Sequence, residues 1–156
     1  MNKKLMLALA IVLSIPVFVF AQSALKNQQR HKRYQLMQQT VRQMQQLTLA
    51  VHKYSFDYKG KMPPMQNPAV FKNALQHYTG QDVFISAASG KPFVPNAKLS
   101  GKPLVQSNRI VWCYDPQTIL GPNSPTKKFR VVGFSNATIA MPESRWQREK
   151  ETAGLP

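Results

Sequence analysis

The chain has 156 residues, enough for one domain with a modest core, and its 12 Pro against 7 Gly indicate long extended connections. Its net charge of +15 favours anionic polymers or lipid head groups as partners, unless this basicity only aids solubility. The single cysteine, Cys113, excludes an intrachain disulfide, and no cysteine lies near residue 21, which excludes a lipid-modified start there.

Residues 1–21 have the order of an export leader. A short basic start precedes an apolar run from Leu5 to Ala21, and Val19 and Ala21 occupy the two positions that a signal peptidase reads. We therefore predict a signal peptide cleaved after Ala21, with the mature protein in the periplasm or secreted. The alternative is an uncleaved N-terminal anchor in the inner membrane, because the run is at the lower limit for a spanning helix.

The segment from Ala24 to Tyr58 contains no Gly or Pro and predicts a long amphipathic helix. Its apolar or weakly polar positions recur at steps of three and four residues: Tyr34, Met37, Val41, Met44, Thr48, Val51, Ser55 and Tyr58. The same pattern suits a coiled coil. Thr48 and Ser55 would weaken such a seam, however, so we expect the helix to pack on a sheet.

A short second helix is predicted after Gly60 and the following prolines end the first one. Asn67 reads as its N-cap and Pro68 as its first helical residue. Its buried side would consist of Val70, Phe71, Ala74, Leu75 and Tyr78. Residues 81–108 then predict a long irregular connection, with Phe84, Phe93 and Leu99 as anchors.

The last third of the chain predicts strands. These are Arg109–Tyr114, Phe129–Phe134 and Thr138–Met141, with a tight turn over 135–137 and a loop over 117–127. The charged segment 143–156 is expected to be a flexible tail. The fold class is therefore α+β, with a long N-terminal helix packed on a small C-terminal antiparallel sheet in a domain spanning 22–142.

A helix that continues from an apolar N-terminus and packs on a small terminal sheet resembles the pilin layout. Residues 47–64 read LTLAVHKYSFDYKGKMPP, and residues 131–141 read VVGFSNATIAM. Both stretches resemble the pseudopilin-like family of planctomycete-type bacteria. The matching positions of the first stretch are Tyr54, Asp57, Tyr58, Gly60, Pro63 and Pro64. The resemblance implies a pilin-like fold and a role in a secretion or pilus-like system.

Two departures from that family affect what the resemblance implies. The prepilin peptidase signature is missing, and the apolar run contains no glutamate to pair with a neighbouring subunit. The terminal hairpin also carries Ser135 and Asn136 where the family has Asp-Gly. The resemblance therefore implies a pilin-like domain rather than a subunit of a pilus shaft.

No reaction is indicated by the reactive side chains. His31, His52 and His77 lack the spacing of metal ligands. Cys113 lies between two aromatic residues on an expected strand, which predicts a buried, inert thiol rather than a nucleophile. We expect no enzyme, and no catalytic, cofactor-binding or metal site.

A candidate anion-contact site consists of Lys127, Lys128, Arg130, Arg145 and Arg148. Phe129 and Trp146 lie close by in sequence, and aromatic residues among basic ones are typical of surfaces that bind nucleic acids. Removing Lys3 and Lys4 with the leader still leaves a charge of +13. The alternative is a solvated strand edge protected by positive charge.

These features lead to two functional expectations. The first is a non-enzymatic, pilin-like envelope module that acts through contacts with other envelope or secretion-system proteins. The second is a basic envelope protein that binds DNA, acidic polysaccharide or anionic lipid weakly, with an affinity that falls as salt rises.

Overall fold

The computed structural model describes residues 3–80, 82–104, 110–121, 124 and 126–156, with side chains from Gln22 onward. The chain divides into two compact units, Met1–Lys32 and Arg33–Pro156. Helix α1, Lys3–Asp57, forms the first unit and opens the second, so it begins earlier than the predicted start at Ala24. Among the described residues, no helix has both the length and the apolar character needed to cross a membrane.

In the second unit, one face of α1 is buried. The buried side chains on this face are Thr40, Met44, Leu47, Ala50, Val51 and Ser55. The predicted stripe is confirmed at its centre, whereas Tyr34 and Tyr58 at its two ends are exposed. Tyr58 leaves the stripe because α1 ends at Asp57.

A second helix follows as predicted. Helix α2, Pro68–Leu75, continues into a short 3₁₀ helix η1, Gln76–Tyr78. The Asn67 side chain accepts a hydrogen bond from the N–H of Val70 at 2.9 Å, which confirms the predicted N-cap. Phe71 and Leu75 bury the inner side of α2.

The sheet is antiparallel and is built around β4, Lys128–Phe134. Strand β2, Val111–Tyr114, and the short β3, Ile119–Leu120, pair with successive parts of β4. Strand β5, Thr138–Pro142, pairs with β4 in register Val131↔Ala140, and β1, Val94–Pro95, pairs with β2. The predicted loop over 117–127 therefore contains a strand, and Arg109 lies outside the described residues.

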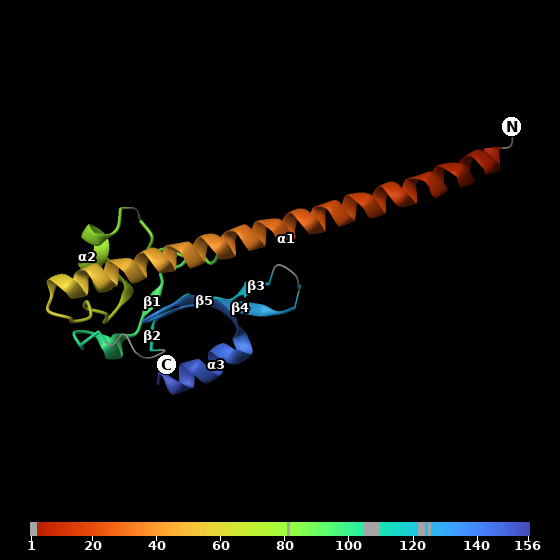
Figure 1. Cartoon of the computed structure of the whole chain (residues 1–156). Coiled ribbons are helices and arrows are strands. Elements are labelled where there is room, and N and C mark those ends of the chain that lie inside the picture. The colour runs from red at the N-terminus through yellow and green to blue at the C-terminus, as the bar shows by residue number, and fades with distance from the viewer. Residues whose placement is uncertain (1–2, 81, 105–109, 122–123, 125) are drawn as a thin grey trace. The chain divides into compact units, whose positions relative to one another are not determined.

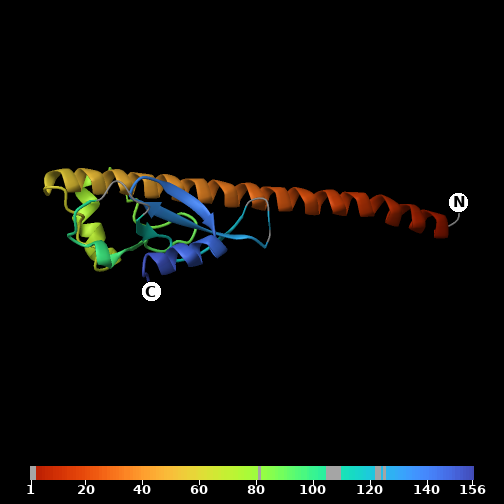
Figure 2. The same ribbon diagram turned by 60° about the horizontal axis from the view of Figure 1, so that its bottom comes forward.

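The two faces of the sheet contribute to two different clusters. Trp112 and Val131 join Met44 and Leu47 of α1 in the larger hydrophobic core. A second cluster contains Val132 and Phe134 of β4, Met141 of β5 and Trp146. Alternation along β4 explains this division, since successive side chains of a strand point to opposite faces. Figures 1 and 2 both show the sheet between the Arg33–Asp57 part of α1 and helix α3.

Helix α3, Glu143–Thr152, corrects the prediction of a flexible tail over 143–156. Its single large apolar side chain, Trp146, is only 2% exposed and lies 4.8 Å from the ring of Tyr114, centroid to centroid. The tail is ordered because the second face of the sheet is apolar and needs a cover.

The irregular connection packs into the larger hydrophobic core. Phe84 and Phe93 are buried as predicted, and Leu99 is half-buried against the larger core. A short 3₁₀ helix η2, Ala97–Leu99, follows β1. Asn96 anchors this region, since its side-chain amide donates to the carbonyl of Val111 at 2.9 Å. The connection is therefore fixed to the sheet edge by packing and by a buried hydrogen bond.

Candidate functional site: an aromatic and basic pocket at the end of the long helix

Arg130, one of the predicted anion-contact residues, has its partners within the fold. Its guanidinium donates to both carboxylate oxygens of Glu143, at 3.2 and 3.1 Å, and to the carbonyl of Asp115 at 2.7 Å. It also lies 5.4 Å from the ring centroid of Trp146. The side chain is only 11% exposed, so its positive charge is used to attach α3 to the sheet.

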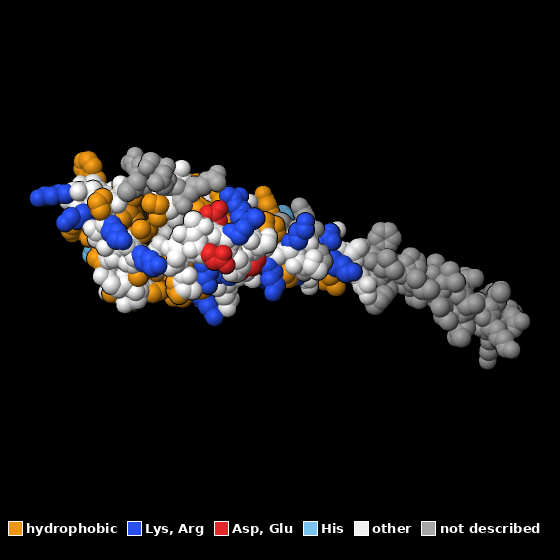
Figure 3. Space-filling view, turned by 90° about the horizontal axis from the view of Figure 1, so that it is seen from below, with side chains coloured by type: hydrophobic (Ala, Val, Ile, Leu, Met, Phe, Trp, Pro, Cys, Tyr) orange, Lys and Arg blue, Asp and Glu red, His pale blue; other side chains and the backbone are white. Residues whose placement is uncertain are grey.

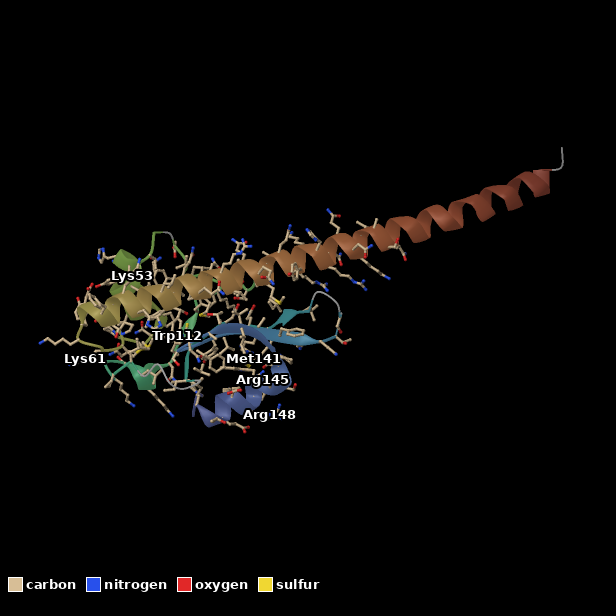
Figure 4. All side chains as sticks on the ribbon, in the orientation of Figure 1. Lys53, Lys61, Trp112, Met141, Arg145 and Arg148 are labelled. Carbon is tan, nitrogen blue, oxygen red and sulfur yellow. The ribbon has the colours of Figure 1, made fainter. Side chains whose placement is uncertain are left out.

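The other four residues of that predicted site lie on two segments. Lys127 and Lys128 are exposed at the start of β4, whereas Arg145 and Arg148 extend from α3 (Figure 4). Arg145 also pairs with Glu149 at 3.4 Å. Figure 3 shows basic side chains spread over the visible face rather than gathered in one place. Whether these four residues bind an anion stays a prediction.

The cysteine and the three histidines lie on α1, η1 and β2. Cys113 is fully buried as predicted, and burial raises the pKa of its thiol well above the ordinary value. His52 is half-buried on α1, while His31 and His77 are exposed. Within the described part of the chain, no three His, Cys, Asp or Glu side chains lie close enough to hold a metal ion.

A buried polar cluster links α1 to the end of the sheet. Ser86 donates to the carboxylate of Asp115, which also accepts the N–H of Gln117 at 3.0 Å. The Thr40 hydroxyl lies 3.4 Å from that of Ser86 and accepts the N–H of Ala88 at 3.0 Å. Asp115 is 1% exposed, but each of these groups has partners within the fold, so the cluster is structural.

A pocket of about 560 Å³ lies where α1 ends. We call it the Tyr58 pocket, and its lining consists of Tyr54, Asp57, Tyr58, Lys59, Lys61, Met62, Pro64, Gln66, Ser100 and Gly101. The end of α1 and the segment after it supply one wall, and the loop after η2 supplies the other. The pocket therefore joins two segments about 40 residues apart in the chain.

Three tyrosines organise the helix side of this pocket. The rings of Tyr54 and Tyr58 stack with centroids 4.1 Å apart and planes 9° apart. Tyr78 meets Tyr54 edge-on and donates its hydroxyl hydrogen to Asp57 at 2.8 Å. This hydrogen bond favours the neutral phenol and raises the pKa of Tyr78 to about 12.

Backbone hydrogen bonds hold the two walls of the pocket together. The N–H of Met62 donates to the carbonyl of Lys102 at 2.8 Å, and the N–H of Leu104 to that of Gly60 at 2.7 Å. The N–H of Met65 donates to the Ser100 hydroxyl oxygen at 3.1 Å. The pocket is consequently preformed in the fold rather than created by a mobile loop.

Leu49 and Phe56 are apolar side chains near the C-terminal end of α1 that are exposed to solvent. Leu49 is 62% exposed and Phe56 is 89% exposed, and their seven-residue spacing places them on the same side of the helix. A depression of about 330 Å³ lies beside Leu49, between α1 and η1, with Lys53 and Val83 on its walls. Exposed apolar side chains next to a depression are typical of protein-contact surfaces.

Sequence reasoning did not identify this pocket, and it named Tyr54, Asp57 and Tyr58 as positions of the family resemblance, not as a site. Tyr54, Asp57 and Tyr58 lie three and four residues apart, a spacing that groups them at one end of a helix. Nothing in the sequence indicates that Ser100 and Gly101 return to them. Comparison of the chain with protein-family models, with curated proteins and with solved structures finds no match.

Proposed function

We propose that the protein is a non-enzymatic, pilin-like module of the bacterial envelope that acts through contacts with other envelope or secretion-system proteins. Residues 1–21 direct it to the envelope, as a cleaved signal peptide or as an anchor. The second unit then presents its surface to partner proteins. In this proposal the domain is an accessory or free-standing component and not a subunit of a pilus shaft.

The observation that carries this proposal is the packing of α1. Helix α1, whose N-terminal part contains the apolar run, lays one face of its Arg33–Asp57 part on an antiparallel sheet, with Met44 and Leu47 in one core with Trp112 and Val131. This arrangement matches the pilin layout, in which the N-terminal part of the helix is at the membrane and the sheet-bearing part faces outward. The exposed Phe56 and Leu49 on the uncovered side of the helix support a role in protein contacts.

Site-specific crosslinking in the native host tests this proposal. A photoreactive amino acid replaces Phe56 in the full chain, and the same amino acid at Lys127 provides a control at another exposed position. We expect the protein in the envelope fraction and discrete crosslinked species of higher mass from position 56 only. A cytoplasmic location, or identical crosslinks from both positions, would contradict the proposal.

A further inference from the structure

We propose that the Tyr58 pocket binds an acidic sugar unit, a pyranose ring that carries a carboxylate, as found along anionic polysaccharides. This inference goes beyond the protein-contact function and does not depend on it, because the pocket is formed entirely within the second unit. Three properties of the pocket support it: a flat aromatic face, a mixed polar lining and two exposed lysines.

The aromatic face is supplied by Tyr58. One side of its ring is covered by Tyr54, with planes 9° apart, and the residue is still 52% exposed. A stacked ring held in this way is a flat, rigid and apolar surface. The C–H face of a pyranose is likewise flat and apolar, so the two surfaces can exclude water from each other.

The polar lining suits a ligand with hydroxyl groups. Asp57 supplies carboxylate oxygens that accept hydrogen bonds, and Gln66 supplies both a donor and an acceptor. The Ser100 oxygen accepts the N–H of Met65, which leaves its own hydrogen to be donated. Each sugar hydroxyl is both a donor and an acceptor, and this lining offers partners for both.

Two lysines give the pocket its preference for a negative charge. Lys59 and Lys61 both line the pocket and are exposed. Neither ammonium group forms an ion pair with another described residue. Figure 4 shows the Lys61 side chain extending from the end of the unit where α1 terminates, away from α3. A carboxylate on the sugar ring would meet these two charges in the pocket.

The geometry favours a sugar over a nucleic acid. A single-stranded nucleic acid needs a basic groove that follows its phosphates, together with aromatic faces for successive bases. The Tyr58 pocket has one free aromatic face, since Tyr54 is covered by its stacking partner. It also places the Asp57 carboxylate in the lining, where a sugar hydroxyl can donate a hydrogen bond to it and a phosphodiester group cannot.

The test uses the full chain, titrated by calorimetry with a galacturonic acid tetramer. The fully methyl-esterified tetramer has the same rings without the charge, and an oligothymidylate of equal charge represents nucleic acid. Tyr58→Ala removes the aromatic face, Tyr58→Phe retains it, and Lys61→Gln removes one charge. Phe56→Ala and Lys127→Gln are matched controls, because both residues are exposed and neither lines the pocket.

We expect saturable binding of the acidic tetramer that Tyr58→Ala weakens by about tenfold and Lys61→Gln by about fivefold. Tyr58→Phe and both controls should bind as the unaltered protein does, and the esterified tetramer should bind more weakly. Since Lys61 is exposed, its substitution tests the pocket even if Tyr58→Ala disturbs the fold. Equal loss with Lys127→Gln, tighter binding of the oligothymidylate, or no binding of the tetramer would each overturn the proposal.

Discussion

Arg130 donates two hydrogen bonds to the carboxylate of Glu143, and this ion pair joins the central strand of the sheet to the first turn of α3. The arginine is 11% and the glutamate 25% exposed at their side chains, so water screens the pair only in part. The pair explains how the charged segment 143–152, in which Trp146 is the single large apolar residue, becomes an ordered helix.

Substitution of Arg130 by Gln should lower the free energy of unfolding by about 1–3 kcal/mol, because Glu143 then loses its charged partner. Urea unfolding followed by tryptophan fluorescence measures this change. Lys128→Gln, at an exposed position of the same strand, should change stability by less than about 0.5 kcal/mol. Equal effects of the two substitutions would show that the pair does not attach α3.

Gly133 allows α1 to approach the sheet closely. A Cβ at this position would lie 3.0 Å from Cε2 of Trp112 and 3.1 Å from Sδ of Met44. Gly133→Ala should therefore destabilise the protein by about 1–3 kcal/mol through overpacking. Gly80→Ala is the control, since a Cβ there meets nothing within 4 Å. Thermal unfolding by circular dichroism measures both, and a neutral Gly133→Ala would contradict the close helix–sheet contact.

Cys113 should resist modification in the folded protein. Burial keeps the pKa of its thiol high, and only the thiolate attacks disulfide reagents. At pH 8 the native protein should react with a chromogenic disulfide much more slowly than the protein unfolded in urea. Rapid stoichiometric reaction of the native protein would show that Cys113 is accessible and would reopen the question of a thiol-based activity.

Tyr78 should lose its proton later than an ordinary tyrosine. Its hydrogen bond to Asp57 raises its pKa from 10.0 to about 12, so the stabilising contribution is complete below pH 10 and is lost as pH rises through about 12. A pH titration followed by absorbance near 295 nm should show a tyrosine that ionises near pH 12, and Tyr78→Phe should abolish this ionisation step. Asp57→Asn should shift it to lower pH. An unchanged profile in both variants would contradict the hydrogen bond.

Local sequence signals were sufficient for much of the fold. The N-cap at Asn67 acts within one turn of helix, and the hairpin around Ser135 closes between adjacent strands, with the N–H of Phe134 donating to the carbonyl of Ala137 at 2.7 Å. The periodicity of α1 predicted burial at Met44 and Val51 correctly. It missed Thr40 and Ala50, whose burial depends on which elements cover the helix rather than on its own pattern.

The remaining features depend on contacts distant in sequence. Val131 and Val132 are both buried, which shows that both faces of β4 are covered. Two adjacent valines on a central strand could have indicated a cover on the second face, and Trp146 and Leu155 are the large apolar side chains of the C-terminal segment that pack there. The Tyr58 pocket had no such signal, because Ser100 reaches it through an irregular connection.

The most direct test of the central claim, an exported pilin-like envelope module, is the intact mass of the native protein recovered from each fraction of its host. We expect recovery outside the cytoplasm, either as a soluble chain that starts at Gln22 or as a membrane-bound chain that retains its N-terminus. Recovery from the cytoplasm as a soluble chain that still carries residues 1–21 would contradict the claim.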